Sequence, residues 1–213
     1  ISYNVIIAYA LNSFRIKDKL FYGAKLVRRS LYFPNYLIPL FFLYGISKYF
    51  QNNFDLIWIF FSLVCSSFIL LKFKEFKVMT NPDLLILMPK CKISEVIWFF
   101  YSLTLSAICQ EIYFKVVFYT QIKASVNIYF ANILTSFCFL EIHFLHSASK
   151  KIFSLKDYII QFLFSVVTLF IFQETGNVLY SIMSHLVYNS IIGCFYLKQF
   201  MISQKVHSYE YTY

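Results

Sequence analysis

The chain has 213 residues, of which 60% are hydrophobic and 14% are charged, and its formal net charge is +9. A soluble domain typically has about 45–50% apolar and 25% charged residues, and a core of this length could not bury the excess apolar surface. The composition therefore excludes a soluble enzyme and a disordered or fibrous chain, and it predicts a protein embedded in lipid. Because the positive charge lies in short runs between apolar stretches, we expect a lipid-bilayer partner and no nucleic acid.

Apolar stretches recur along the whole chain, and a transmembrane helix needs about 20 largely apolar residues. In chain order the candidate spans are Ile1–Phe14, Leu31–Phe50, Leu56–Leu71, Ile93–Cys109, Val126–His146, Tyr158–Phe172 and Val178–Leu197. We interpret the short first stretch as the end of a span rather than as a signal peptide, because no basic segment precedes it. Pro34 and Pro39 should kink the second span. The predicted fold is an all-α, polytopic bundle of about seven transmembrane helices, or eight if the first span is truncated.

Basic residues gather in alternate loops. They are Arg15, Lys17, Lys19, Lys25, Arg28 and Arg29, then Lys72, Lys74 and Lys77, then Lys150, Lys151 and Lys156, and finally Lys198 and Lys205. The positive-inside rule places these loops and the C-terminus in the cytoplasm of a multi-pass cell-membrane protein. We expect one membrane domain in three parts: N-terminal helices with basic cytoplasmic loops (1–92), a core (93–197) and a cytoplasmic tail (198–213).

Titratable and amide side chains gather in the spans of the second half, although each charged group there costs about 2.5–3.5 kcal/mol on insertion scales. They are Glu111, Lys115, Glu141, His143, His146, His185 and Asn189. Three pairs are four residues apart and so share a helix face: Glu111 with Lys115, Phe139 with His143, and His185 with Asn189. A carboxylate beside two imidazoles can deprotonate water and stabilise an oxyanion, and it can equally bind a divalent metal. The pattern therefore predicts an internal polar site.

These positions lie in three motifs that resemble those of the CPBP family of CAAX proteases and bacteriocin-processing proteins, also called Abi. Gln110–Lys115 resembles its EExxxR motif, and Phe139–His143 matches its FxxxH motif. Thr175–Gly176, followed by His185–Asn189, resembles its third motif, a TG turn that leads into HxxxN. The motifs occur in the family's order, and the resemblance covers approximately residues 93–197.

The resemblance implies an intramembrane endopeptidase that cuts near the C-terminus of prenylated or peptide substrates, in a family that also serves bacteriocin maturation and self-immunity. It implies that a glutamate of the first motif and His143 activate water, while His185 and Asn189 stabilise the oxyanion. Family members are often labelled metalloproteases, although a metal-free mechanism is also implied. The cofactor thus stays open: if zinc binds, Glu111, His143 and His185 are its expected ligands.

Two motif positions depart from the family pattern. Gln110 replaces the glutamate usually assigned as the general base, and Lys115 replaces an arginine. A glutamine cannot accept a proton at neutral pH. Either Glu111 takes over as the base, although it lies about 100° around the helix from position 110, or the chain is a catalytically degenerate immunity or binding protein. A small transporter subunit is a third alternative.

Each site residue also has a plain structural interpretation. Glu111 and Lys115 are alternatively an ion pair at a helix end, His143 a packing residue bonded to a backbone carbonyl, and Asn189 a hydrogen-bonding link between helices. A straight helix that ends near Cys109 would also place Glu111 and His143 near opposite membrane faces. We therefore expect residues 110–122 to form a separate, bent or re-entrant helix that lines a polar cavity.

Overall fold

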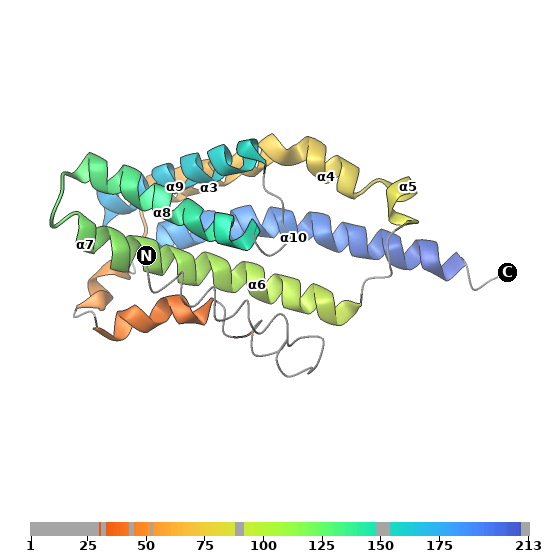
Figure 1. Ribbon diagram of the computed structural model, residues 1–213, viewed down its shortest axis with the longest axis horizontal. Coiled ribbons are helices and arrows are strands. Elements are labelled where there is room, and N and C mark those ends of the chain that lie inside the picture. Colours follow the sequence, from red (N-terminus) through yellow and green to blue (C-terminus); the bar gives the residue numbers. More distant parts are fainter. Residues whose placement is uncertain are drawn as a thin grey trace.

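The computed structural model describes residues 30, 33–42, 45–51, 53–87, 92–147 and 154–209, and all regular structure in these residues is helical (Figure 1). The predicted all-α class is confirmed. The first predicted span, Ile1–Phe14, lies outside the described residues.

The helices run in the order η1 (Pro34–Phe42), η2 (Ile46–Tyr49), α3 (Leu56–Ser66), η3 (Ser67–Lys72), α4 (Phe73–Met79), α5 (Pro82–Leu85), α6 (Ile93–Glu111), η4 (Ile112–Tyr119), α7 (Thr120–Ile122), α8 (Ile128–Ser147), α9 (Leu155–Thr175) and α10 (Val178–Tyr209). Four continuous stretches of the described chain are long and apolar enough to cross a membrane: Leu56–Met79, Ile93–Ile122, Leu155–Thr175 and Val178–Val206. The protein is thus a multi-pass helical membrane protein by length and composition, and the count of seven spans stays a prediction.

The second predicted span is not one long helix. The described residues between 33 and 50 form the two short 3₁₀ helices η1 and η2. Pro39 lies inside η1 and supplies no backbone N–H, and Gly45, before η2, has a left-handed φ of 73°. A proline and a left-handed residue both interrupt the hydrogen-bond ladder of an α-helix. The sequence predicted a kink here, and the interruption is larger than a kink.

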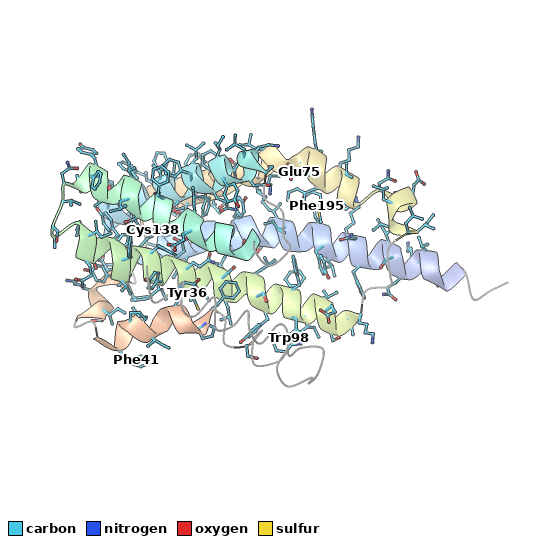
Figure 2. All side chains as sticks on the ribbon, in the orientation of Figure 1. Tyr36, Phe41, Glu75, Trp98, Cys138 and Phe195 are labelled. Atoms are coloured by element: carbon cyan, nitrogen blue, oxygen red, sulfur yellow. The ribbon has the colours of Figure 1, made fainter. Side chains whose placement is uncertain are left out.

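α10 is the central helix of the bundle and packs against α6, α3 and α9 along its length (Figure 1). Gly193 lets α10 pack closely against Phe100 of α6, because a Cβ there would lie 2.6 Å from Phe100 Cε1 and the ring would have to shift. Further along α10, Phe195 stacks on Phe76 of α4 at 4.4 Å between ring centroids (Figure 2). The outer faces expose apolar side chains such as Phe41 (87% exposed), which suits contact with lipid.

The helix that carries the first motif is longer than predicted. Its predicted end at Cys109 was wrong, because α6 continues through the π-helical segment η4 into α7 and ends at Ile122. Residues 110–122 are therefore not a separate helix. Glu111 lies 11 residues before the end at Ile122, and Phe139 lies 11 residues after the start of α8 at Ile128. Because the two helices run antiparallel across a short loop, Glu111 and Phe139 lie at similar depth. His143 is only one turn further along α8, so Glu111 and His143 do not lie near opposite membrane faces.

Candidate functional site

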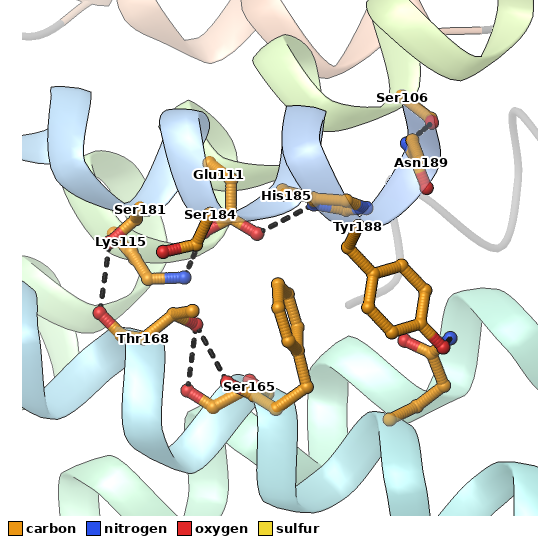
Figure 3. Close-up of polar contacts among 12 residues, drawn as sticks. Ser106, Glu111, Lys115, Ser165, Thr168, Ser181, Ser184, His185, Tyr188 and Asn189 are labelled. Atoms are coloured by element: carbon orange, nitrogen blue, oxygen red, sulfur yellow. Dashed lines mark hydrogen bonds and ion pairs between the residues drawn. The ribbon is translucent and has the colours of Figure 1, made fainter. Parts of the chain in front are cut away.

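Glu111 is the centre of a buried polar network (Figure 3). It is the last residue of α6, its side chain is 0% exposed, and both carboxylate oxygens have partners. Oε2 forms an ion pair with Nζ of Lys115, one turn later in η4, and Oε1 lies 2.8 Å from Nδ1 of His185 on α10. Lys115 and His185 are themselves 1% and 5% exposed. The ion pair therefore lies inside the bundle and not at an interfacial helix end.

The carboxylate fixes the orientation of His185. An ionised carboxylate only accepts hydrogen bonds, so His185 Nδ1 carries the proton and Nε2 remains as the second ring nitrogen. Two aromatic rings pack edge-on against the imidazole, Phe164 at 5.5 Å and Phe139 at 6.1 Å between centroids. Because hydrogen bonding and packing both restrain the ring, His185 is held in one orientation.

Small hydroxyl residues surround the ion pair and tie the neighbouring helices together (Figure 3). Ser181 Oγ donates to the Thr168 carbonyl at 2.9 Å, which links α10 to α9. Ser66 Oγ donates to the Ser184 carbonyl at 2.8 Å, which links α3 to α10. Such residues let helix backbones approach closely within a membrane. These residues were not predicted as part of the site, although serine and threonine within apolar spans are a weak signal for such contacts.

Asn189 lies one turn beyond His185 and contacts α6 at an earlier point than Glu111. Its amide Nδ2 donates to the Leu103 carbonyl at 2.7 Å and to Ser106 Oγ at 3.2 Å. Both N–H donors of this side chain are therefore used. The structure contains the link between helices that was one interpretation of Asn189, and an oxyanion role would require the side chain to release these bonds.

The turn of the third motif sets the position of α10 relative to α9. Gly176 ends α9 in the left-handed region (φ 64°), where only glycine is unstrained, and its N–H donates to the Phe172 carbonyl at 2.9 Å. Asn177 Oδ1 then accepts from Leu179 N at 3.1 Å, so its side chain caps the start of α10. The Asn177 amide also donates to the Gln51 carbonyl at 2.9 Å. The turn thus fixes where His185 lies opposite α9.

The remaining motif residues are partly described. Phe139 is 0% exposed and packs against Phe114 at 5.4 Å between ring centroids. His143 lies one turn further along α8, and its side chain is outside the described residues, as is that of His146. Gln110 is 3% exposed, next to Glu111 at the end of α6. The structure therefore brings Glu111, Lys115, His185 and Phe139 together.

Zinc ligation by Glu111 does not fit this arrangement. One carboxylate oxygen is paired with the Lys115 ammonium and the other accepts from His185, so the carboxylate already balances a positive charge. Within the part of the chain that the structure describes, no three histidine, cysteine or acidic side chains form a metal-binding group.

The fold and the site define a multi-pass helical membrane protein with an acid-oriented histidine buried among its helices. Residues 92–191 match the family model of the type II CAAX prenyl endopeptidases, Rce1-like. This match confirms the resemblance to the CPBP family over that part of the chain, which includes Glu111, Lys115, His185 and Asn189. Neither the comparison with curated proteins nor that with solved structures found a match.

Proposed function

We propose that the chain is an intramembrane endopeptidase of the CAAX prenyl type, which hydrolyses a peptide bond near the C-terminus of a prenylated protein or peptide. The observation that carries the proposal is the buried hydrogen bond between Glu111 and His185. It lies within the segment that matches the protease family. A carboxylate that orients an imidazole is a recurring device for hydrolysis of acyl compounds.

In the proposed mechanism Glu111 positions His185 and does not act as the base. Both of its oxygens already accept from cationic or N–H donors, so the carboxylate is engaged with Lys115 and His185 and not with an attacking water. His185 presents Nε2 to the substrate, where the ring can donate to the oxyanion once it is protonated or hold the attacking water. Lys115 balances the carboxylate charge in the interior, where an isolated charge would be costly.

The proton of the attacking water then needs another acceptor. Gln110 cannot supply one, because an amide does not accept protons at neutral pH. We assign this role to His143, on α8 one turn after Phe139. Its imidazole takes a proton as water adds to the carbonyl carbon, and the imidazolium returns that proton to the leaving amine when the peptide bond breaks.

Cleavage of a panel of isoprenylated and leader peptides tests these roles with purified protein in lipid. We expect His143→Ala and His185→Ala each to lower kcat by about 10²–10⁴-fold, the range for general acid–base groups. Ser190→Ala is the matched control on α10, because its side chain is exposed and contacts the Leu186 carbonyl of its own helix. Equal turnover in the wild type and all three variants would contradict the assignment.

A catalytically degenerate immunity or binding protein is the second candidate, and Gln110 is the observation that favours it. The substitution Gln110→Glu distinguishes the two. Cleavage by the wild-type chain supports the peptidase, whereas activity that occurs only in Gln110→Glu shows that the natural chain has lost its base. In that case a role in bacteriocin immunity becomes the better proposal.

A further inference from the structure

Several buried polar atoms near the site have no hydrogen-bond partner. The described residues contain seven such side-chain atoms, one of which, Asp157 Oδ1, forms an ion pair with Lys72. Five of the other six lie on η4, α8 and α9: Tyr119 Oη, Asn132 Oδ1, Thr135 Oγ1, Ser136 Oγ and Gln173 Nε2. Buried polar groups nearly always have a partner, which is often an ordered water, and lipid offers none. Tyr119 and Gln173 lie close enough to interact with each other, so the three unpaired atoms on α8 are the ones that point to a common ligand.

The atoms on α8 share one face of the helix. Asn132, Thr135 and Ser136 are three and four residues apart, and Phe139 follows at the same spacing. Thr135 and Ser136 are 1% and 0% exposed. α8 packs against α9 and η4, so these hydroxyl groups point into the bundle and not into lipid.

The unpaired atoms extend from the loop at 123–127 to the depth of the ion pair. Near the loop, Tyr119 packs in one apolar cluster with Ala131. Its ring centroid lies 6.2 Å from that of Phe172, the residue before Gln173. Deeper in the bundle, Phe114 packs on Phe139. Along α8, Thr135 lies between Ala131 and Phe139, the residues that make these two contacts. Along η4, Lys115 lies between their partners, Phe114 and Tyr119.

Lys115, at the inner end of this region, is a further hydrogen-bond donor. A lysine ammonium can donate three hydrogen bonds, and the described structure gives Lys115 one partner, Glu111. A ligand that extends from Thr135 to Lys115 would therefore both accept from an ammonium and serve hydroxyl groups that donate and accept. Water has this chemistry, and buried waters typically make about three hydrogen bonds each.

We propose that the α8 face formed by Asn132, Thr135 and Ser136 binds a chain of buried waters that leads from the 123–127 end of the bundle to Lys115, Glu111 and His185. These waters satisfy the unpaired atoms and shield the ammonium. One further step rests on the proposed function: this chain of waters supplies the water molecule that hydrolysis consumes.

Cysteine accessibility in native membranes tests the path directly. We compare Ser136→Cys with Phe137→Cys. Phe137 is the next residue along α8, and it is 57% exposed on the outer face of the helix. Each is treated with the small, water-soluble reagent 2-aminoethyl methanethiosulfonate, and labelling at the substituted residue is read by mass spectrometry. A thiol must ionise to react, which requires water. We expect Ser136→Cys to react at least about tenfold faster, and equal rates would overturn the proposal.

Thr135→Val supplies a second measurement that does not depend on the reagent. Valine has nearly the shape of threonine without the hydroxyl. If Thr135 binds water, the variant lowers Tm or leaves it unchanged; if the hydroxyl is dry and unpaired, removing it raises Tm, and the path is refuted. Both readouts are independent of turnover. If the α8 face is hydrated but the protein cleaves no peptide, the water path is supported and the proposed peptidase function is refuted.

Discussion

Lys115 is the residue whose replacement should reveal most about the site. Its side chain and that of Glu111 are 2% and 0% exposed, so neither charge is solvated by bulk water. Lys115→Met keeps the apolar stem but leaves Glu111 as a buried carboxylate with only His185 as a partner. Breaking a buried ion pair in this way costs about 3–5 kcal/mol, which is roughly 10²–10⁴-fold in the folding equilibrium constant.

Reversible unfolding by sodium dodecyl sulfate in mixed micelles measures this cost. Lys74→Met is the matched control, because Lys74 is exposed on α4 and its removal should change the free energy of unfolding by less than about 0.5 kcal/mol. The double variant Lys115→Met with Glu111→Gln removes both charges and leaves an amide oxygen that can still accept from His185. We expect it to recover most of the lost stability.

Two results would refute this reasoning. If Lys115→Met costs no more than Lys74→Met, water already solvates the Glu111 carboxylate and the pair is not buried in the working protein. If the double variant is less stable than Lys115→Met alone, the ionised Glu111 contributes through a partner other than Lys115, and our description of the network is wrong.

Three further predictions concern other parts of the site. Asn189→Leu should lower the free energy of unfolding by about 1–3 kcal/mol through its lost bonds to α6; a large fall in kcat with unchanged stability would instead show an oxyanion donor. Gly176→Ala should cost about 1–2 kcal/mol in the same unfolding assay, because its φ of 64° is left-handed, and an unchanged midpoint would contradict that backbone geometry. Incubation with 1,10-phenanthroline should leave peptide cleavage unchanged, since Glu111 is already paired; loss of activity that added zinc restores would contradict this.

Much of the site followed from helical spacing and motif order, because these depend on local geometry. Glu111 and Lys115 are four residues apart, and the structure pairs them. Spacing did not reveal that His185 and Asn189 contact different partners. Residues on one face but one turn apart are separated by about 5–6 Å along the axis. The same helix, α6, therefore meets His185 with the Glu111 carboxylate and Asn189 with the Leu103 carbonyl.

The ends of the helices were harder to predict, because hydropathy treats a charged residue as the end of a span. Glu111 and Lys115 interrupted the apolar pattern after Cys109, although the helix continues to Ile122. A charge costs less inside a membrane protein when another charge or a hydrogen bond compensates it, and here Lys115 on η4 and His185 on α10 supply both to Glu111. Only the tertiary structure contains this information.

The buried pair also bears on whether the chain retains a function at this site. Replacing a buried ion pair with apolar residues of similar volume is often neutral or stabilising. A protein that used its fold only as a binding scaffold would therefore lose little stability if Glu111 and Lys115 were both apolar. This chain instead keeps both charges at 0% and 1% exposure and uses the carboxylate to hold His185. Of the two motif residues that depart from the family pattern, Gln110 lies next to that carboxylate, and Lys115 keeps the positive charge that pairs with it. The carboxylate that orients His185 is therefore still present. We therefore expect Gln110→Glu to raise turnover, because the new carboxylate would join a preformed site. We also expect it to lower the free energy of unfolding, because position 110 is 3% exposed and a second carboxylate beside Glu111 has no cation of its own.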